Sequence, residues 1–430
     1  MSRILLRGGR LLDPSTGTDE VADLLIEDGR VAARGADLEV GDAEVIDVSG
    51  RWVCPGFVDL HSHLRDPGQE YKEDIATGGR SAAAGGFTAV ACMANTQPVN
   101  DDPATTDFIL DRAEHDSPVR VYPVAAATRG LEGKVMTEMS ALVAAGAVAF
   151  SDDGKTIMDT GVMRRVLEYS KLVNVPIITH AEDRTLVAGG VVNEGEVSTR
   201  LGLPGNPSLA EEVLIVRDLA LAEFTGAHLH VAHVSTRGGA AAIRAAKERG
   251  VHVTSEVTPH HLTLTDLEVL EFETNAKVAP PLRSEGDRDA CRAALCDGTV
   301  DAIATDHAPH AMHEKELDFR EAPPGMIGFE TAVPVTLDLV RTGELAPLAW
   351  VSRLSTQPAR IIAREGGSLE AGAVADVVVV DPEASWIYDP TKGYSKSHNS
   401  PWAGSTLTGR VTHTFVGGRL VYDVLRGVLQ

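Results

Sequence analysis

Eight short apolar segments occupy the middle of the 430-residue chain, and alanine-rich stretches with helical spacing lie between most of them. Continuous apolar strands that alternate with helices are typical of a parallel sheet with both faces covered. Eight such units favour a (β/α)8 TIM-like barrel. A doubly wound open sheet is the alternative, but no GxGxxG motif follows the first strand. The predicted strands are 52–60, 87–93, 119–124, 147–150, 176–179, 228–232, 251–257 and 300–305, and the clearest predicted helices are 104–116, 161–173, 209–225 and 238–249.

The two ends of the chain carry a different pattern, in which short β-rich segments are broken by turn signals. Residues 22–26 near the start and 375–380 near the end are examples, and Asp28-Gly29 is one of the turns. Because both ends have this β character, we expect them to combine into one small sandwich. The predicted domains are a composite β-sandwich from residues 1–55 and 367–430, and a hydrolase-type barrel from residues 56–366.

Composition excludes several classes of partner. The chain has 62 acidic and 39 basic residues and a formal net charge of −23, which argues against nucleic acid or an anionic membrane as a partner. No apolar run approaches the roughly 20 residues that span a bilayer, and the N-terminus lacks the apolar core of a signal peptide. Four scattered cysteines without a CxxC pair are typical of a reduced compartment. We therefore predict a cytoplasmic protein.

The first predicted barrel strand runs into two histidines, His61 and His63. Side chains two residues apart on a strand point to the same side, so both imidazoles can face one metal ion. Such a pair alone is weak support for a metal site, because a strand end can carry histidines that bind nothing. Stronger support for a metal site comes from the residues at the ends of the other predicted strands.

In a (β/α)8 barrel the active site forms at the C-terminal ends of the strands. The remaining predicted strands end in Asn95, Thr128, Asp152 with Asp153, His180, His233, His260 with His261, and Asp306 followed by His307 and His310. Four imidazoles and two carboxylates from this set exceed the needs of one tetrahedral zinc ion. They fit two metal ions that share a bridging carboxylate and a bridging hydroxide.

The order of the strands suggests which of these ligands would hold each of the two metal ions. The histidine pair on the first strand would hold one metal, and His180 and His233 on neighbouring strands would hold the other. Asp153 lies between the fourth and fifth strands and is placed to bridge. Asp306, on the closing strand beside the first, would reach both a metal and the attacking hydroxide, so we expect it to be the general base.

In combination, seven motifs in the chain resemble those of the dihydroorotases, in the longer bacterial type I group of the amidohydrolase superfamily. The resemblance extends over nearly the whole chain, including the split terminal domain. The motifs are DLHSHLRDPG (59–68), MANT (93–96), SDDG (151–154), THAE (179–182), HVAHVS (230–235), EVTPHH (256–261) and ATDHAPH (304–310).

The resemblance implies a reaction and its cofactors. The reaction is the reversible hydrolysis of (S)-dihydroorotate to N-carbamoyl-L-aspartate in de novo pyrimidine (UMP) biosynthesis, through a metal-activated hydroxide with Asp306 as general base. The cofactor is Zn2+, one or two ions per chain, with two favoured. The implied partners are the small-molecule substrate and a second copy of the chain in a homodimer. An association with aspartate transcarbamoylase is a further partner that the resemblance allows.

The resemblance also implies roles for individual residues. Arg65 lies two residues after a predicted metal ligand, where a guanidinium can pair bidentately with a substrate carboxylate. Lys155 is the alternative to Asp153 as bridge, because many members of the wider superfamily use a carboxylated lysine. Ala279 stands where type I relatives usually carry a substrate-contacting Asn. The implied metal ligands are His61, His63, Asp153, His180, His233 and Asp306, and the implied substrate contacts are His63, Arg65, Asn95, His310, Pro324 and Gly325.

Two other functions stay open at this point. One is a different cyclic amidohydrolase, such as a hydantoinase (dihydropyrimidinase) or an allantoinase. Its substrates generally lack the carboxylate, so Arg65 and Asn95 argue against it. The other is a non-catalytic dihydroorotase-like partner of aspartate transcarbamoylase. Such chains lose metal ligands, whereas this one keeps all six. His260 and His261 receive no ligand role.

Overall fold

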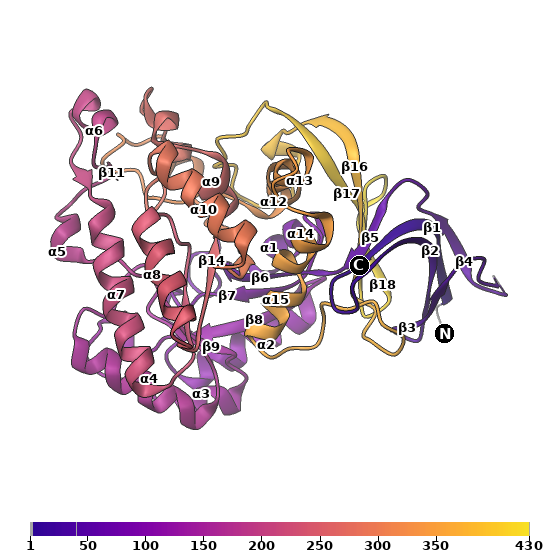
Figure 1. The fold of residues 1–430 in the computed structure, drawn as a ribbon, viewed down its shortest axis with the longest axis horizontal. Coiled ribbons are helices and arrows are strands. Elements are labelled where there is room, and N and C mark those ends of the chain that lie inside the picture. Colours follow the sequence, from indigo (N-terminus) through magenta and orange to yellow (C-terminus); the bar gives the residue numbers. More distant parts are fainter. Residues whose placement is uncertain (1–2, 40, 430) are drawn as a thin grey trace.

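The computed structural model describes residues 3–39 and 41–429 and contains two large sheets (Figure 1). One is an eight-stranded parallel sheet in the order β15-β14-β13-β10-β9-β8-β7-β6. All eight predicted barrel strands are present in it, which confirms the (β/α)8 prediction. The strands are β6 (Phe57–Ser62), β7 (Phe87–Cys92), β8 (Arg120–Ala125), β9 (Ala149–Ser151), β10 (Ile177–Thr179), β13 (Leu229–Val231), β14 (Val253–Val257) and β15 (Ala302–Ile303).

Contacts between the first and last strands close this sheet into a barrel. Ser62 forms a parallel bridge with His307, and the His63 backbone N–H donates to the His307 carbonyl at 2.8 Å. The buried Asp59 carboxylate accepts from the Thr305 N–H at 2.8 Å and from the Thr305 hydroxyl at 2.6 Å. The C-terminal ends of β6 and β15 are therefore side by side, as the position of the predicted site requires.

Helices cover the outside of the barrel, and side chains cap several of them. Asp102 and Asp159, for example, each accept a hydrogen bond from an N–H in the first turn of the following helix. Among the described helices, none is long and apolar enough to cross a membrane. The helices are α1 (Ile75–Ala84), α2 (Pro103–Asp116), α3 (Met139–Ala145), α4 (Thr160–Val173), α5 (Arg184–Val187), α6 (Glu196–Leu201), α7 (Ser208–Thr225), α8 (Arg237–Glu248), α9 (Pro259–Thr263), α10 (Glu285–Asp297), α11 (Met312–Lys315), α12 (Phe329–Thr336), α13 (Asp338–Arg341), α14 (Pro347–Leu354) and α15 (Thr356–Ile361).

The second sheet joins the two ends of the chain, and its strands lie together at one end of the molecule in Figure 1. Its order is β19-β18-β17-β16-β5-β1-β2-β3, with β4 paired to β1. Antiparallel pairing of β5 with β16 links the N-terminal strands to the C-terminal ones. The strands are β1 (Arg3–Asp13), β2 (Thr18–Glu27), β3 (Arg30–Gly35), β4 (Glu44–Asp47), β5 (Trp52–Pro55), β16 (Val377–Ile387), β17 (Thr406–Val416), β18 (Arg419–Asp423) and β19 (Gly427–Val428).

The predicted strand 52–60 is divided between the two sheets. Its first part is β5 of the terminal sheet and its second part is β6 of the barrel, and Gly56 is the break. A Cβ at Gly56 would lie 2.3 Å from the Thr88 side chain, so no larger residue fits at this crossing. The two sheets are therefore joined by a single residue at this point.

The connection between β16 and β17, residues 388–405, leaves the terminal sheet and runs along the barrel. We call it the strap. Its Ser397 hydroxyl donates to the Lys72 carbonyl at 2.7 Å, and its Asn399 side chain donates to the Ala308 carbonyl at 3.0 Å. The strap thus brings part of the C-terminal segment to the rim where the site lies.

Candidate metal centre and active site

The six predicted metal ligands converge at the C-terminal rim of the barrel, and all are buried. Asp153, which follows β9, lies at the centre of the group. Its Oδ1 is 3.4 Å from His61 Nε2, 3.4 Å from His180 Nδ1 and 3.7 Å from His233 Nε2. Its Oδ2 is 3.6 Å from His63 Nε2. One carboxylate therefore faces imidazoles from three different strands, which is the geometry a bridging ligand needs.

Asp306, which follows β15, faces the histidine pair of β6. Its Oδ1 is 3.1 Å from His63 Nε2 and 3.6 Å from His61 Nε2. Two groups of three residues could each hold a metal ion, because the ligand atoms within each group all lie within 4.8 Å of one another. One group is His61, Asp153 and His233, and the other is His61, His63 and Asp306. The sharing of His61 makes the two groups one continuous cluster.

The cluster fits a divalent metal. His61 Nε2 is buried, yet it has no hydrogen-bond partner within the described part of the chain. Two ring nitrogens, His180 Nδ1 and His233 Nε2, face each other at 2.9 Å. Imidazole nitrogens and carboxylate oxygens arranged in this way are the ligand set of zinc and similar ions.

The histidines and carboxylates of the cluster stabilise each other's charged forms. Burial opposes a charge on His61, but Asp153 and Asp306 hold its pKa well above the ordinary value. Burial alone would raise the pKa of Asp153, yet His61, His180 and His233 hold it well below its usual range. Burial likewise opposes ionisation of Asp306, and His61 and His63 nonetheless lower its pKa. Both carboxylates are therefore ionised at neutral pH, as metal ligands must be.

Glu256, on β14, orients His61 from behind. Its Oε1 is 2.8 Å from His61 Nδ1, and its Oε2 is 3.1 Å from His230 Nε2. Burial alone would raise the pKa of Glu256, but these hydrogen bonds lower it to about 2, so the carboxylate is an acceptor for both rings. Because Glu256 holds the Nδ1 proton of His61, Nε2 is the nitrogen that would bind a metal once its own proton is displaced. No role was predicted for Glu256, although an acidic residue within an apolar strand is a usable signal of a buried polar contact.

We expect Glu256→Gln to weaken metal binding by about 10- to 100-fold, because a neutral amide no longer fixes the His61 ring as the carboxylate does. Competition of the metal-free protein with a chromophoric chelator measures this affinity. Asp13→Asn, which alters a buried carboxylate in the terminal sheet, is the matched control. Equal affinity in wild type and Glu256→Gln would exclude the orienting role.

Asn95 combines two functions at the rim. Its Oδ1 is 2.9 Å from His63 Nδ1, so it orients His63 as Glu256 orients His61. Its Nδ2 makes only a long contact of 3.5 Å with Asp153 Oδ2. The amide N–H groups of Asn95 are thus available to a ligand next to the cluster.

Arg65 brings a buried positive charge to the edge of the cluster. Its Nε donates to the Pro309 carbonyl at 3.3 Å, and its terminal nitrogen lies 3.5 Å from His310 Nε2. No described carboxylate lies within the 4.0 Å ion-pair distance of this guanidinium. His310 Nε2 is in turn 3.0 Å from the Pro324 carbonyl. Burial lowers the pKa of Arg65, while the carboxylates of Asp306, Asp153 and Glu314 favour its charge without pairing with it directly. The direct ion pair is therefore open to a carboxylate of a ligand.

Three site residues have strained backbones. Arg65, His233 and Asp306 have φ angles of 61°, 32° and 47°, in the left-handed region that L-residues rarely adopt. Such conformations cost roughly 1–3 kcal/mol each and persist where the surrounding structure enforces them. Here they turn the side chains at three strand ends into the rim.

Other polar residues at the strand ends hold the loops together. Asp152 accepts from the Thr128 N–H at 2.9 Å and from the Thr128 hydroxyl, so these two residues satisfy each other. His261 Nδ1 is 2.8 Å from the Thr258 hydroxyl, and its Nε2 donates to the Pro280 carbonyl at 3.1 Å. These residues connect neighbouring loops of the rim.

The structure also locates Lys155, Ala279 and His260, three residues whose roles the sequence left open. Lys155 is exposed, whereas Asp153 lies inside the cluster, so the geometry favours Asp153 as bridge. Ala279 lines a cavity of about 300 Å³ together with Glu182, Asn206 and Pro324. The space at Ala279 is therefore next to the predicted substrate contact Pro324. His260 is buried, and burial lowers its pKa to about 4.

Similar solved structures define the class of protein. The chain matches the L-hydantoinase (dihydropyrimidinase) from Arthrobacter aurescens with a TM-score of 0.90 and 27% identity, over 100% of this chain and 98% of that one. A D-hydantoinase (dihydropyrimidinase) from Thermus sp., 24% identical, shares the fold with a TM-score of 0.86, over 99% of this chain and 97% of that one. With the histidine and aspartate rim, this fold defines a metal-dependent cyclic amide hydrolase of the amidohydrolase type.

Sequence relatives narrow the class to a family. The dihydro-orotase-like family matches residues 50–239. A dihydroorotase from Anaeromyxobacter dehalogenans is 52% identical over 427 residues, 98% of this chain and 99% of the relative. A dihydroorotase from Syntrophus aciditrophicus is 51% identical over 423 residues, again 98% and 99%. The chain belongs to the dihydroorotase family, which confirms the resemblance seen in its motifs.

Proposed function

We propose that this chain catalyses the reversible hydrolysis of dihydroorotate to N-carbamoyl-aspartate, the step that pyrimidine synthesis runs as a cyclisation. The observation that carries the proposal is the buried guanidinium of Arg65 at the rim, which forms no direct ion pair with a carboxylate of the described residues. Dihydroorotate supplies that carboxylate on the same small ring that carries the amide. A hydantoin ring without a carboxylate would leave the guanidinium without a direct ion pair.

We propose Zn2+ as the metal, two ions per chain, held by the six-residue cluster with Asp153 shared between them. When bound, the metal polarises the amide carbonyl and lowers the pKa of the attacking water. Glu256 and Asn95 keep His61 and His63 in the tautomers that leave Nε2 free. The protein therefore supplies a rigid set of ligands before the substrate arrives.

The remaining residues position the substrate and move its protons. Arg65, Asn95 and His310 hold the carboxylate, and the backbone at Pro324 and Gly325 lines the ring. His63, besides its metal role, borders the same space. In the hydrolytic direction, the water oxygen bonds to the ring carbonyl carbon and the ring C–N bond breaks.

Asp306 carries the proton through this reaction. It accepts a proton from the attacking water and delivers it to the departing ring nitrogen, so that this nitrogen leaves as the neutral NH2 of the carbamoyl group. Its position 3.1 Å from His63 Nε2 places the carboxylate oxygen inside the cluster rather than at its surface. In the cyclisation direction the same residue removes the proton from the nitrogen.

A turnover assay with a substrate panel tests the proposal. We expect the purified protein to hydrolyse dihydroorotate at least about 100-fold more efficiently than hydantoin or allantoin, because a site built around a charged contact rejects analogues that lack it. Elemental analysis of the same sample should give two zinc ions per chain. Preference for a carboxylate-free ring would overturn the assignment.

We propose a cytoplasmic homodimer as the working form. All four cysteines are free, and Cys54, Cys92 and Cys291 are buried, which suits a reducing compartment. The family resemblance also implies an assembly with aspartate transcarbamoylase. Light scattering of the protein alone, and after mixing with that enzyme, distinguishes the two assemblies.

A further inference from the structure

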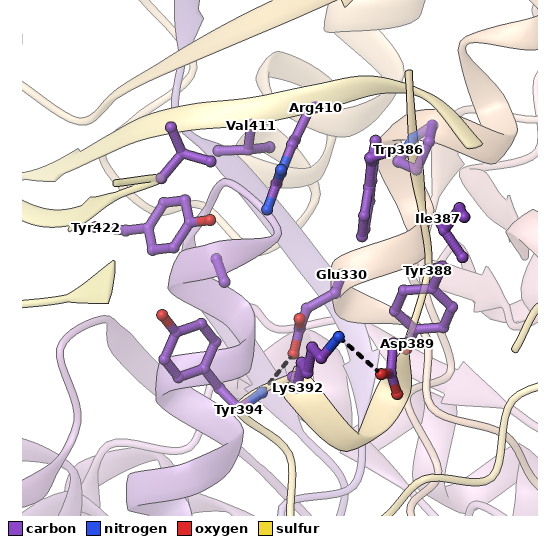
Figure 2. Close-up of a pocket in the computed structure, with 14 residues that line it drawn as sticks. Glu330, Trp386, Ile387, Tyr388, Asp389, Lys392, Tyr394, Arg410, Val411 and Tyr422 are labelled. Carbon is purple, nitrogen blue, oxygen red and sulfur yellow. Dashed lines mark hydrogen bonds and ion pairs between the residues drawn. The ribbon is translucent and has the colours of Figure 1, made fainter. Parts of the chain in front are cut away.

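The strap, residues 388–405, is fixed to the barrel along its length. Its Tyr394 backbone N–H donates to Glu330 of α12 at 2.8 Å, and the same carboxylate oxygen accepts from the Ser81 hydroxyl at 2.9 Å. Figure 2 shows the Glu330 side chain pointing to the strap at Tyr394, at the wall of a cavity of about 170 Å³. Further along, Ser397 donates to the Lys72 carbonyl at 2.7 Å. The strap therefore has a defined position from which it can act on the rim.

All the side-chain hydrogen bonds of Asn399, in the strap, are made to one loop of the rim. Its Nδ2 donates to the carbonyls of Ala308 and Gly325, each at 3.0 Å, and its Oδ1 accepts from the His310 N–H at 3.1 Å. Its backbone carbonyl accepts from the Ile327 N–H at 2.9 Å. The residue is only 3% exposed. Both amide hydrogens and the acceptor are thus committed to the loop.

These contacts join the two legs of the loop that follows β15. One leg, residues 308–310, carries His310, and the other, residues 324–327, carries Pro324 and Gly325. The Ala308 N–H donates to the Met326 carbonyl at 2.8 Å. At Gly325 (φ 141°) a Cβ would lie 2.8 Å from the Ala308 Cβ, so the legs touch directly there. Asn399 lies across this contact and sets the distance between the legs.

The loop in turn supports the guanidinium of Arg65. Pro309, in the first leg, accepts from Arg65 Nε at 3.3 Å, and His310 packs against the terminal nitrogens at 3.5 Å. The Pro324 carbonyl of the second leg holds the His310 ring at 3.0 Å. A shift between the legs would therefore move Arg65, His310 and Pro324 relative to one another.

We infer that Asn399 is a positioning residue for the carboxylate-binding side of the active site. It acts from a segment outside the barrel, through the backbone of the loop, without reaching the metal cluster. The inference rests on the proposed function in so far as it names dihydroorotate as the molecule that the loop receives. Loss of Asn399 should therefore impair substrate binding and leave metal binding intact.

The test compares two substitutions at Asn399 in the full-length, metal-loaded protein. Asn399→Ala removes every side-chain contact, and Asn399→Asp keeps the acceptor for His310 but turns an oxygen toward the carbonyls of Ala308 and Gly325. We expect both to lower kcat/KM for dihydroorotate by about 10- to 100-fold, mainly through KM, because a displacement near 1 Å is enough for such a loss. Zinc content should equal that of the wild type.

A matched control separates positioning from a general loss of structure. Ser400→Ala alters the next buried residue of the strap, whose hydroxyl accepts from the Trp402 N–H at 3.4 Å within the strap itself. This variant should keep the wild-type KM. An equal rise in KM for Ser400→Ala, or an unchanged KM in both Asn399 variants, would overturn the inference.

Hydrogen exchange gives a readout that does not depend on the substrate. In the ligand-free Asn399→Ala protein, the His310 amide loses its side-chain acceptor and should exchange faster than in the wild type, whereas the Ile327 amide keeps the backbone carbonyl of residue 399 as its acceptor. Unchanged exchange of the His310 amide would contradict the positioning role. If the wild type fails to turn over dihydroorotate, the proposed function fails, whereas the exchange experiment still decides the role of Asn399.

Discussion

Replacing Arg65 by Met should lower kcat/KM for dihydroorotate by roughly 30- to 4,000-fold. Loss of one partner from a desolvated, hydrogen-bonded charge pair costs roughly 2–5 kcal/mol, and 1.4 kcal/mol corresponds to a factor of ten. The structure makes this contact strong because the guanidinium is buried and has no described carboxylate partner of its own. Methionine keeps much of the apolar stem and removes the fork. Steady-state kinetics with dihydroorotate measure the change.

A carboxylate-free ring shows whether the effect comes from the substrate. Residual activity of Arg65→Met on dihydrouracil should change far less, because that ring never used the contact. Arg164→Met, at an exposed position on α4 whose guanidinium donates to Glu168 at 2.8 Å, is the matched control and should behave as wild type. A similar fall on both rings would mean that Arg65 supports the fold or the metal cluster, and the carboxylate argument would fail.

Asp306→Asn should lower kcat by about 100-fold or more, the low end expected for general acid–base catalysis. The carboxylate lies 3.1 Å from His63 Nε2 and is ionised at neutral pH, since His61 and His63 hold its pKa down against the effect of burial. Asparagine has nearly the same shape but cannot accept and return a proton. Single-turnover kinetics at saturating dihydroorotate isolate the chemical step.

Metal content must be measured in the same Asp306→Asn samples, because Asp306 is also a predicted ligand. The informative comparison is made at equal zinc occupancy. Asp152→Asn changes a different buried carboxylate, which accepts hydrogen bonds from Thr128, and should retain most activity. If the kcat of zinc-loaded Asp306→Asn stays within about threefold of the wild type, another group must move the proton.

The barrel and its metal cluster could be predicted because the signals are local. Each strand is a continuous apolar run, and barrel topology turns the order of strands into proximity at one rim. His61, Asp153 and Asp306 are therefore brought together by a rule that needs no three-dimensional information beyond strand order. The separations of His61 Nε2 from Asp153 (3.4 Å) and from Asp306 (3.6 Å) agree with that reasoning.

Contacts between segments far apart in sequence could not be predicted in this way. Asn399 is 91 residues from Ala308, and neither position belongs to a periodic pattern. The break at Gly56 was missed because an apolar run looks the same whether one sheet or two receive it. The predicted domain boundary at 366/367 stays a prediction, and the strap shows that residues after it contribute to the rim.

The strap also gives the site an order of assembly during synthesis. Ribosomes extend the chain from its N-terminus, so β6 and every predicted metal ligand are made before residue 307. The leg that carries His310 gains its Asn399 contacts only after the strap emerges, and β5 waits for β16 to complete its sheet. A chain released before residue 388 would contain all six predicted metal ligands but lack the Asn399 contacts that fix the substrate loop. Competence for the reaction is thereby tied to synthesis of the last part of the chain.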